Sequence, residues 1–226
     1  DNQLIRQANR AIVIEPVGGN RTLNLFRATR LRQGEYIYDS LVAADGRTAV
    51  VNDSNGITIW NLSDQSSTFY DQHLPYRHQI ISPDGQLLAS TDRDGGVIVQ
   101  ATATLEPVFT QETEGFPQIA LGQTLVAVGL EETIYFYDVW HGEETAVFST
   151  DWFEENNTVR LLAFSEDEQL LAVVTDHSIL SILQRNGAEW REIHRVQLDP
   201  AWWSNEALAF SADNTLLAVA QDYYSN

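Results

Sequence analysis

Metal and acid–base chemistry in this chain would depend on its histidines and carboxylates, and their spacing favours neither. No two histidines stand four residues apart, the helical spacing of a zinc site, and no Cys is present to act as a thiolate ligand or nucleophile. A Gly-x-Ser-x-Gly elbow, a phosphate-binding loop and a dinucleotide fingerprint are also absent. The sequence therefore predicts no catalytic residue, no metal and no cofactor. The histidines considered are His73, His78, His141, His177 and His194.

Two acidic patterns could imitate functional sites. The run Asp92-Arg93-Asp94-Gly95-Gly96 resembles the start of a calcium loop, but Val97, Ile98 and Val99 stand where later ligands would be needed, so a hairpin turn is favoured. Adjacent acids are typical of a solvated surface and are not interpreted as an acid–base pair. They occur as Glu131-Glu132, Glu143-Glu144 and Glu154-Glu155.

A repeat determines which elements position these residues. The segment 82–92 begins Ser82-Pro83-Asp84-Gly85 and recurs as 165–176 and 211–220, with a looser copy at 45–51 and a degenerate one at 122–128. The turn positions Asp45, Asp84, Gln123, Asp167 and Asp213 are 39, 39, 44 and 46 residues apart. This period fits a four-stranded β-propeller blade and does not fit helical repeats.

Each repeat reads as four strands. An apolar strand, a turn built from Asp with Gly or Asn, and a second apolar strand come first, because Asp and Gly tolerate turn dihedrals. A third strand follows with alternating residues, and a fourth, more polar strand is predicted at the outer edge. The third strands are expected at 57–61, 97–99, 133–138 and 178–183, and the fourth at 67–70, 106–110, 145–149 and 190–196. The predicted units are 1–35 (partial), 36–72, 73–112, 113–150, 151–198 and 199–226 (partial).

Over residues 36–222 the chain resembles the WD40-repeat family of β-propellers, in its bacterial type with degenerate repeats. Trp60-Asn61 and Tyr137-Asp138 stand where that family has a Trp-Asp dipeptide, and the Ser-Pro-Asp-Gly opening is typical of bacterial members. The resemblance implies that Trp60 and Tyr137 are packing residues. It also implies a structural Asp in the turn between second and third strands, at Asp53, Asp92, Asp176 and Asp222.

Departures from the family pattern are also present. No Gly-His pair precedes a first strand, Gln100-Ala101 and Leu183-Gln184 replace the Trp-Asp pair in two units, and the third unit lacks its turn Asp. The first 35 residues match the second and third strands of a blade, with strands at 11–15 and 22–26. The chain is therefore expected to enter and leave in mid-blade. It either closes a ring of about five blades or, the favoured interpretation, is part of a larger, seven-bladed ring.

Two acidic segments rich in aromatic residues, 151–157 and 199–206, fall between a fourth strand and the next first strand. By the resemblance, these connections emerge on the same face as the turns between second and third strands. An aromatic cluster ringed by acids would suit a cationic or Arg-rich partner; alternatively, the aromatics pack between blades. The candidate interaction residues are Trp152, Phe153, Glu154, Glu155, Trp202 and Trp203, near His177, Tyr223 and Tyr224.

Charge narrows the range of partners. The 226 residues include 32 acidic residues and 13 basic ones, giving a formal net charge of −19, which repels phosphate backbones and disfavours nucleic acid. No apolar run is long enough to insert into a membrane. An acidic chain without Lys gives a weak indication of an extracellular or salt-adapted setting.

The favoured hypothesis is a non-enzymatic scaffold or sensor module that binds proteins, as part of a longer multidomain protein. One alternative is an enzyme or small-ligand binder with its site in the central channel, which would need inward-facing His, Arg or acids from several blades. Another is a structural subunit of an extracellular assembly. The first strands carry few such groups, which favours the scaffold.

Overall fold

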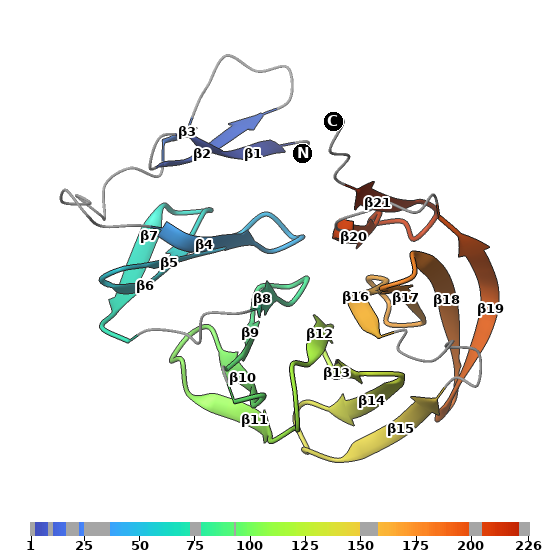
Figure 1. The fold of residues 1–226 in the computed structure, drawn as a ribbon. Helices are drawn as coiled ribbons and strands as arrows, with labels where there is room; N and C mark the ends of the chain where they lie inside the picture. Colours follow the sequence, from blue (N-terminus) through green and yellow to red (C-terminus); the bar gives the residue numbers. More distant parts are fainter. Residues whose placement is uncertain are drawn as a thin grey trace, which may run out of the picture. The chain divides into compact units, whose positions relative to one another are not determined.

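The computed structural model describes residues 3–8, 11–16, 23–24, 37–72, 78–92, 94–149, 158–198 and 205–221. Their regular elements are strands joined into antiparallel sheets, shown in Figure 1, so the predicted all-β fold of four-stranded blades is confirmed. A helix capable of crossing a membrane is not found in this described part of the chain. The chain divides into unit 1, residues 1–76, and unit 2, residues 77–226.

Unit 1 contains two sheets within its described residues. The predicted strands at 11–15 and 22–26 correspond to β2 and β3, and β1, which the sequence analysis does not predict, pairs with β2 along its whole length. The second sheet is a complete blade in the order β4-β5-β6-β7. The strands are β1 (Gln3–Ala8), β2 (Ala11–Pro16), β3 (Leu23–Asn24), β4 (Ile37–Val42), β5 (Thr48–Asp53), β6 (Gly56–Asn61) and β7 (Ser66–Tyr70).

Unit 2 contains three four-stranded blades and a two-stranded sheet within its described residues. The first blade has β8 (His78–Ile81), β9 (Leu87–Thr91), β10 (Val97–Ala101) and β11 (Pro107–Gln111). The second has β12 (Gln118–Leu121), β13 (Leu125–Leu130), β14 (Thr133–Asp138) and β15 (Glu144–Ser149). The third has β16 (Val159–Phe164), β17 (Leu170–Thr175), β18 (Ile179–Asn186) and β19 (Glu189–Gln197), and the last sheet has β20 (Asn205–Phe210) and β21 (Leu217–Gln221).

The first strands of consecutive unit 2 sheets lie side by side, because β12 contacts both β8 and β16, and β16 contacts β20. The second strands are mostly apolar because both of their faces are covered. In β9, every residue from Leu87 to Thr91 is buried. The fourth strands lie at the edges of their sheets and are more exposed, as predicted (Figure 1).

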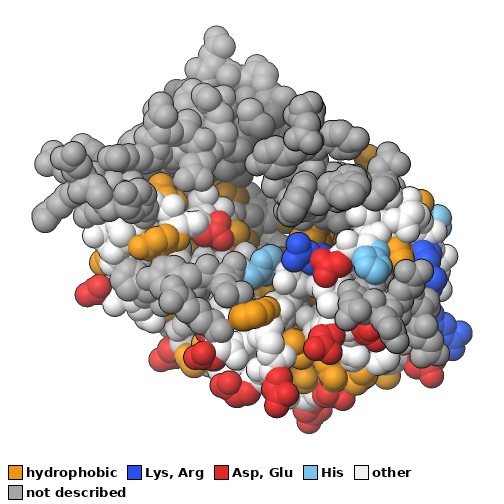
Figure 2. Space-filling model, viewed as in Figure 1, with side chains coloured by type: hydrophobic (Ala, Val, Ile, Leu, Met, Phe, Trp, Pro, Cys, Tyr) orange, Lys and Arg blue, Asp and Glu red, His pale blue; other side chains and the backbone are white. Residues whose placement is uncertain are grey.

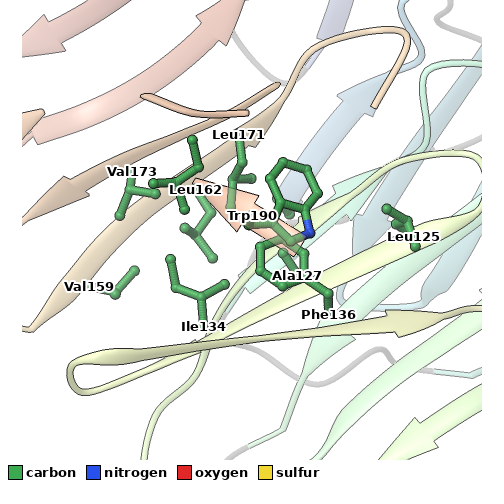
Figure 3. Close-up of a cluster of buried hydrophobic side chains, with 11 residues drawn as sticks. Leu125, Ala127, Ile134, Phe136, Val159, Leu162, Leu171, Val173 and Trp190 are labelled. Carbon is green, nitrogen blue, oxygen red and sulfur yellow. The ribbon is translucent and has the colours of Figure 1, made fainter. Parts of the chain in front are cut away.

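An apolar seam joins the second and third blades of unit 2 (Figure 3). The ring of Phe136, on β14, stacks on Trp190, on β19, with centroids 4.4 Å apart and planes 9° from parallel. Phe164 packs against both rings at an angle. Similar seams join the first blade to the second and the third blade to the last sheet. The seam in Figure 3 contains Ala120, Leu125, Ala127, Ile134, Phe136, Val159, Leu162, Leu171, Val173, Leu183 and Trp190.

The turn between first and second strands repeats one hydrogen-bond pattern. The Ser165 hydroxyl donates to Asp167 Oδ1 at 2.7 Å and accepts from Leu170 N at 2.9 Å, while Gln169 N donates to the same carboxylate. Equivalent bonds form in the turns that begin at Ser82 and Ser211. The repeated Ser and Asp of the sequence are therefore the residues that close each turn.

The turn at Gly122-Gln123-Thr124 has neither the Ser nor the Asp, and Glu168 of the next blade supplies the missing carboxylate. Its Oε1 accepts from Thr124 N at 2.7 Å and also from Gln123 N, while Oε2 accepts from the Thr124 hydroxyl. A side chain on Gly122 would prevent this, because its Cβ would lie 2.1 Å from Glu168 Oε1. Glu168 is buried and occupies the position where other turns have Gly46 or Gly85, with φ +56°.

We predict that Glu168→Ala lowers the free energy of unfolding by about 2–3 kcal/mol, because the partly buried amides of the 122–124 turn lose a charged acceptor. Glu168→Gln keeps an acceptor oxygen and is expected to cost about 1 kcal/mol. Urea unfolding of both variants measures this. The exposed neighbour Glu166→Ala is the control, with a change within about 0.5 kcal/mol. Equal stability of wild type and Glu168→Ala would contradict the role given to this side chain.

The turn at Asp213 has a measurable pH signature. Hydrogen bonds from the Ser211 hydroxyl and then from Thr215 lower the pKa of Asp213 from 3.8 to about 2. Because the folded-state pKa lies below that of the unfolded chain, this carboxylate stabilises the fold above pH 4, and its contribution is lost as pH falls toward 2. In a carboxyl NMR titration we expect an Asp213 midpoint near 2 that rises in Ser211→Ala. A wild-type midpoint at 3.8 would contradict these bonds.

Candidate functional site

The antiparallel order of each blade separates its connections onto two faces. Turns between second and third strands, and the segments that lead from one blade to the next, emerge at the end where each first strand begins, which we call the entry face. Turns between first and second strands, and between third and fourth, emerge at the opposite end, the far face. Because the first strands of unit 2 lie side by side, each face gathers loops from consecutive blades.

Most of the predicted interaction residues lie outside the described residues. They are Trp152, Phe153, Glu154, Glu155, Trp202, Trp203, Tyr223 and Tyr224, and the predicted structural residue Asp222 lies outside as well. His177 is described, and it is exposed on the entry-face turn between β17 and β18. Its backbone oxygen accepts a hydrogen bond from Gln197 Nε2 at 2.8 Å, which fixes this turn to the outer strand β19.

The other predicted structural residues have these environments. Trp60 and Tyr137 are buried in apolar clusters, and burial followed by the charge of Glu144 raises the pKa of Tyr137. Asp53 is buried, and its Oδ1 accepts from Asn55 N at 2.7 Å. Asp92 Oδ1 accepts from Asp94 N and Gly96 N, so this calcium-like run forms a hydrogen-bonded turn. Among described residues, no group of three or more His, Cys, Asp or Glu could hold a metal ion.

Arg160 and Asp176 form an ion pair on the entry face. Arg160 Nε lies 2.6 Å from Asp176 Oδ1, and the Thr158 hydroxyl donates to Asp176 Oδ2. The Asp176 amide also donates to Thr158 O at 2.9 Å. The sequence analysis did not single out Arg160, because it precedes the apolar core of β16. Its charge is compensated by this carboxylate.

The connection 112–117 leads from β11 into β12 on the entry face, and all of its residues are described. It presents an aromatic side chain. Phe116 is 61% exposed, whereas Pro117 is buried at the start of β12. Glu112 and Glu114 are exposed on either side of Thr113. Sequence analysis missed Phe116, although the same combination of an aromatic ring with acids in the adjacent connections, 151–157 and 199–206, is the signal that would have found it.

Close contacts with the preceding turn fix this connection. The Thr113 hydroxyl donates to Gly95 O, and Gln111 Nε2 donates to Glu112 O at 2.9 Å. Gly95 has φ +99°, and a Cβ there would lie 2.4 Å from Gly115 O and 2.7 Å from Thr113 O. The connection therefore lies against the backbone of the β9–β10 turn, which orients Phe116 before any partner binds.

The entry face of unit 2 carries a strong excess of carboxylates. Glu131 and Glu132 are exposed on the β13–β14 turn of the blade that follows Phe116, and Asp94 is exposed on the preceding turn. Glu131 O accepts from Val159 N at 2.9 Å, which joins that turn to β16. Figure 2 shows acidic side chains gathered over β10 to β15, where Lys and Arg side chains are scarce. A positive side chain approaching Phe116 would be attracted by this field.

Comparisons with known proteins support the fold. A chain in the crystal structure of the mitotic checkpoint complex matches with a TM-score of 0.61 and 14% identity, covering 97% of this chain and 81% of that one. A chain in the complex of KlAtg21 with the coiled-coil of AgAtg16 matches with a TM-score of 0.71 and 12% identity, covering 97% and 74%. No family model matches the sequence. No curated protein matches it either.

At these identities the likeness shows the fold alone. Both similar structures are WD40-type propellers, and together with the four-stranded antiparallel sheets they define a protein of the WD40-like β-propeller fold. That fold is compatible with enzymes as well as with binding proteins, so the function must be argued from surface residues.

Gly95→Ala tests how the Phe116 connection is held. The added methyl group would collide with Gly115 O and Thr113 O, so we expect backbone amides at 112–117 to exchange with solvent about tenfold faster. Gly187→Ala is the matched control, because Gly187 also has a positive φ, +66°, but no atom within 4 Å of an added Cβ. Hydrogen exchange detected by mass spectrometry measures both. Unchanged exchange at 112–117 in Gly95→Ala would contradict the close packing.

Proposed function

We propose that this chain is a non-enzymatic protein-interaction module whose entry face binds a cationic, Arg-rich segment of a partner. The observation that carries the proposal is the exposed ring of Phe116, held by backbone contacts and flanked by Glu112 and Glu114. Aromatic anchors provide much of the energy of protein interfaces, and an exposed ring next to carboxylates suits contact with a cationic partner.

Arginine is the side chain that this surface fits best. Its planar guanidinium stacks on an aromatic ring while its N–H groups bind carboxylates in pairs, and a Lys ammonium cannot do both equally well. Acids surround Phe116 on its own connection and on two neighbouring turns. Arg160 on this face already forms an ion pair with Asp176, so its charge does not oppose the binding of a positively charged partner.

The adjacent connections extend the same surface in our proposal. Segments 151–157 and 199–206 combine Trp152, Phe153, Trp202 and Trp203 with Glu154, Glu155 and Glu206. Each of these connections leads from a fourth strand into the next first strand, so we propose that both belong to the entry face. Three successive blades would then offer an aromatic ring within an acidic rim. Such a series favours an extended partner segment over a single small ligand.

The similar structures are consistent with this proposal. One is a checkpoint complex and the other a complex with a coiled-coil, so both were determined in assemblies with other proteins. Seven or fewer blades would serve the proposed function equally, because the surface is built from consecutive blades of unit 2 and does not require a closed ring.

A labelled hexa-arginine peptide tests the proposed function. Fluorescence anisotropy should detect binding that weakens with added salt, and Phe116→Ala should reduce the affinity about fivefold, since a cation–π contact contributes about 1 kcal/mol. The matched control is Phe69→Ala, because Phe69 is similarly exposed, at 53%, but lies on the edge strand β7. Equal affinities for wild type and Phe116→Ala would reject the entry face as the binding surface.

A further inference from the structure

Trp140 presents a second exposed aromatic ring, on the far face. It lies on the connection between β14 and β15, and the residue is 51% exposed. Its indole Nε1 donates to Gln123 O at 3.1 Å, and its backbone N donates to Asp138 Oδ1 at 2.9 Å. The ring is therefore fixed against the neighbouring turn while half of its surface remains open to solvent.

Asp138 holds this connection in place. Burial pushes its pKa up, but the net pKa is lowered because His141 N, the His141 ring and Trp140 N all donate to or pair with the carboxylate. The His141 Nδ1 atom lies 2.9 Å from Asp138 Oδ1. The carboxylate thus stays charged well below neutral pH and accepts hydrogen bonds from the loop that carries the ring.

Carboxylates lie on both sides of Trp140. Glu143 is exposed on its own connection, and Glu144 is exposed at the start of β15. On the next blade, Glu166 and Asp167 are exposed in the 165–169 turn. Glu168 of the same turn accepts hydrogen bonds from Gln123 N and Thr124 N. The backbone oxygen of Gln123 in turn accepts the hydrogen bond from the Trp140 indole. The Glu168 contact therefore brings the acids of one blade beside the ring of another.

The positive side chains at this end of the second and third blades already have partners within the chain. Arg185 Nε donates to Gly187 O, Arg191 pairs with Glu189, and the His141 ring pairs with Asp138. None of the far-face turns of unit 2 contains Lys or Arg, and they span 82–86, 102–105, 122–124, 139–143, 165–169, 187–188 and 211–216. A fixed indole with exposed carboxylates on two sides matches a guanidinium in shape and charge, and Trp is the strongest aromatic partner for a cation.

We infer that Trp140, with Glu143, Glu144, Glu166 and Asp167, forms a second docking surface for an arginine-containing protein segment, on the face opposite Phe116. The two surfaces belong to neighbouring parts of unit 2, so one chain can bind two cationic segments at once. A partner with two such segments would bind more tightly than either segment alone, because the second contact becomes intramolecular.

The indole N–H signals of the protein test this inference separately from the proposed function. The chain has six Trp residues, and Trp140→Phe identifies the Trp140 signal in a ¹H–¹⁵N spectrum. Titration with hexa-arginine should shift the Trp140 signal while buried Trp190 stays in place. If the signals of Trp152, Trp202 or Trp203 shift and that of Trp140 does not, the far-face surface is rejected and the entry-face proposal stands.

Variants complete the test. Trp140→Ala should weaken hexa-arginine binding about fivefold in the Phe116→Ala background, where the entry face contributes less to the measured affinity. Should Trp140→Ala fail to fold, the double variant Glu143→Gln, Glu144→Gln keeps the ring and should weaken binding about threefold. Hexalysine is expected to bind more weakly than hexa-arginine. Wild-type affinity in the double variant or in Trp140→Ala, each on the Phe116→Ala background, would overturn the inference.

Discussion

Apolar packing between neighbouring blades is the interaction on which the rest of unit 2 depends. A single four-stranded sheet exposes two apolar faces, and it becomes stable only when other sheets cover them. The stacked rings of Phe136 and Trp190, one from each blade, lie in such a seam and are nearly completely buried. The seam fixes one sheet against the next and therefore fixes the turns at their ends.

Polar contacts between turns join neighbouring blades in addition to the apolar packing. Glu168 binds the shortened turn of the preceding blade, and Asn214 Oδ1 accepts from Glu166 N at 3.0 Å one blade further on. Both residues occupy the left-handed position of the repeated turn, where a Gly would suffice for the backbone. Their side chains use that position to join one blade to the next, at a cost in backbone strain that these hydrogen bonds offset. The described far-face turns of unit 2 are thereby joined from blade to blade.

The sequence predicts the repeated part of this structure and misses what lies between repeats. Asp84, Asp167 and Asp213 identify the turns because each acts within its own blade, and the apolar second strands follow from local pattern. The bridge from Glu168 to Thr124 joins residues 44 positions apart, so no local pattern reveals it. Phe116 and Trp140 are single aromatic residues in connections, and only their exposure distinguishes them from core residues. The paired Trp residues at 202 and 203 stand out in the sequence but lie outside the described residues.

We propose that this protein binds cationic partners through the loops at the ends of its blades and not through the edges of its sheets. Hydrogen exchange of the whole chain with and without hexa-arginine tests it most directly, because every backbone segment is followed at once. Binding through the loops predicts slower exchange at 112–117 and 139–143, with no change along the edge strands β15 and β19. Slower exchange along β15 and β19, with none in those loops, would show pairing with a strand edge and contradict the account.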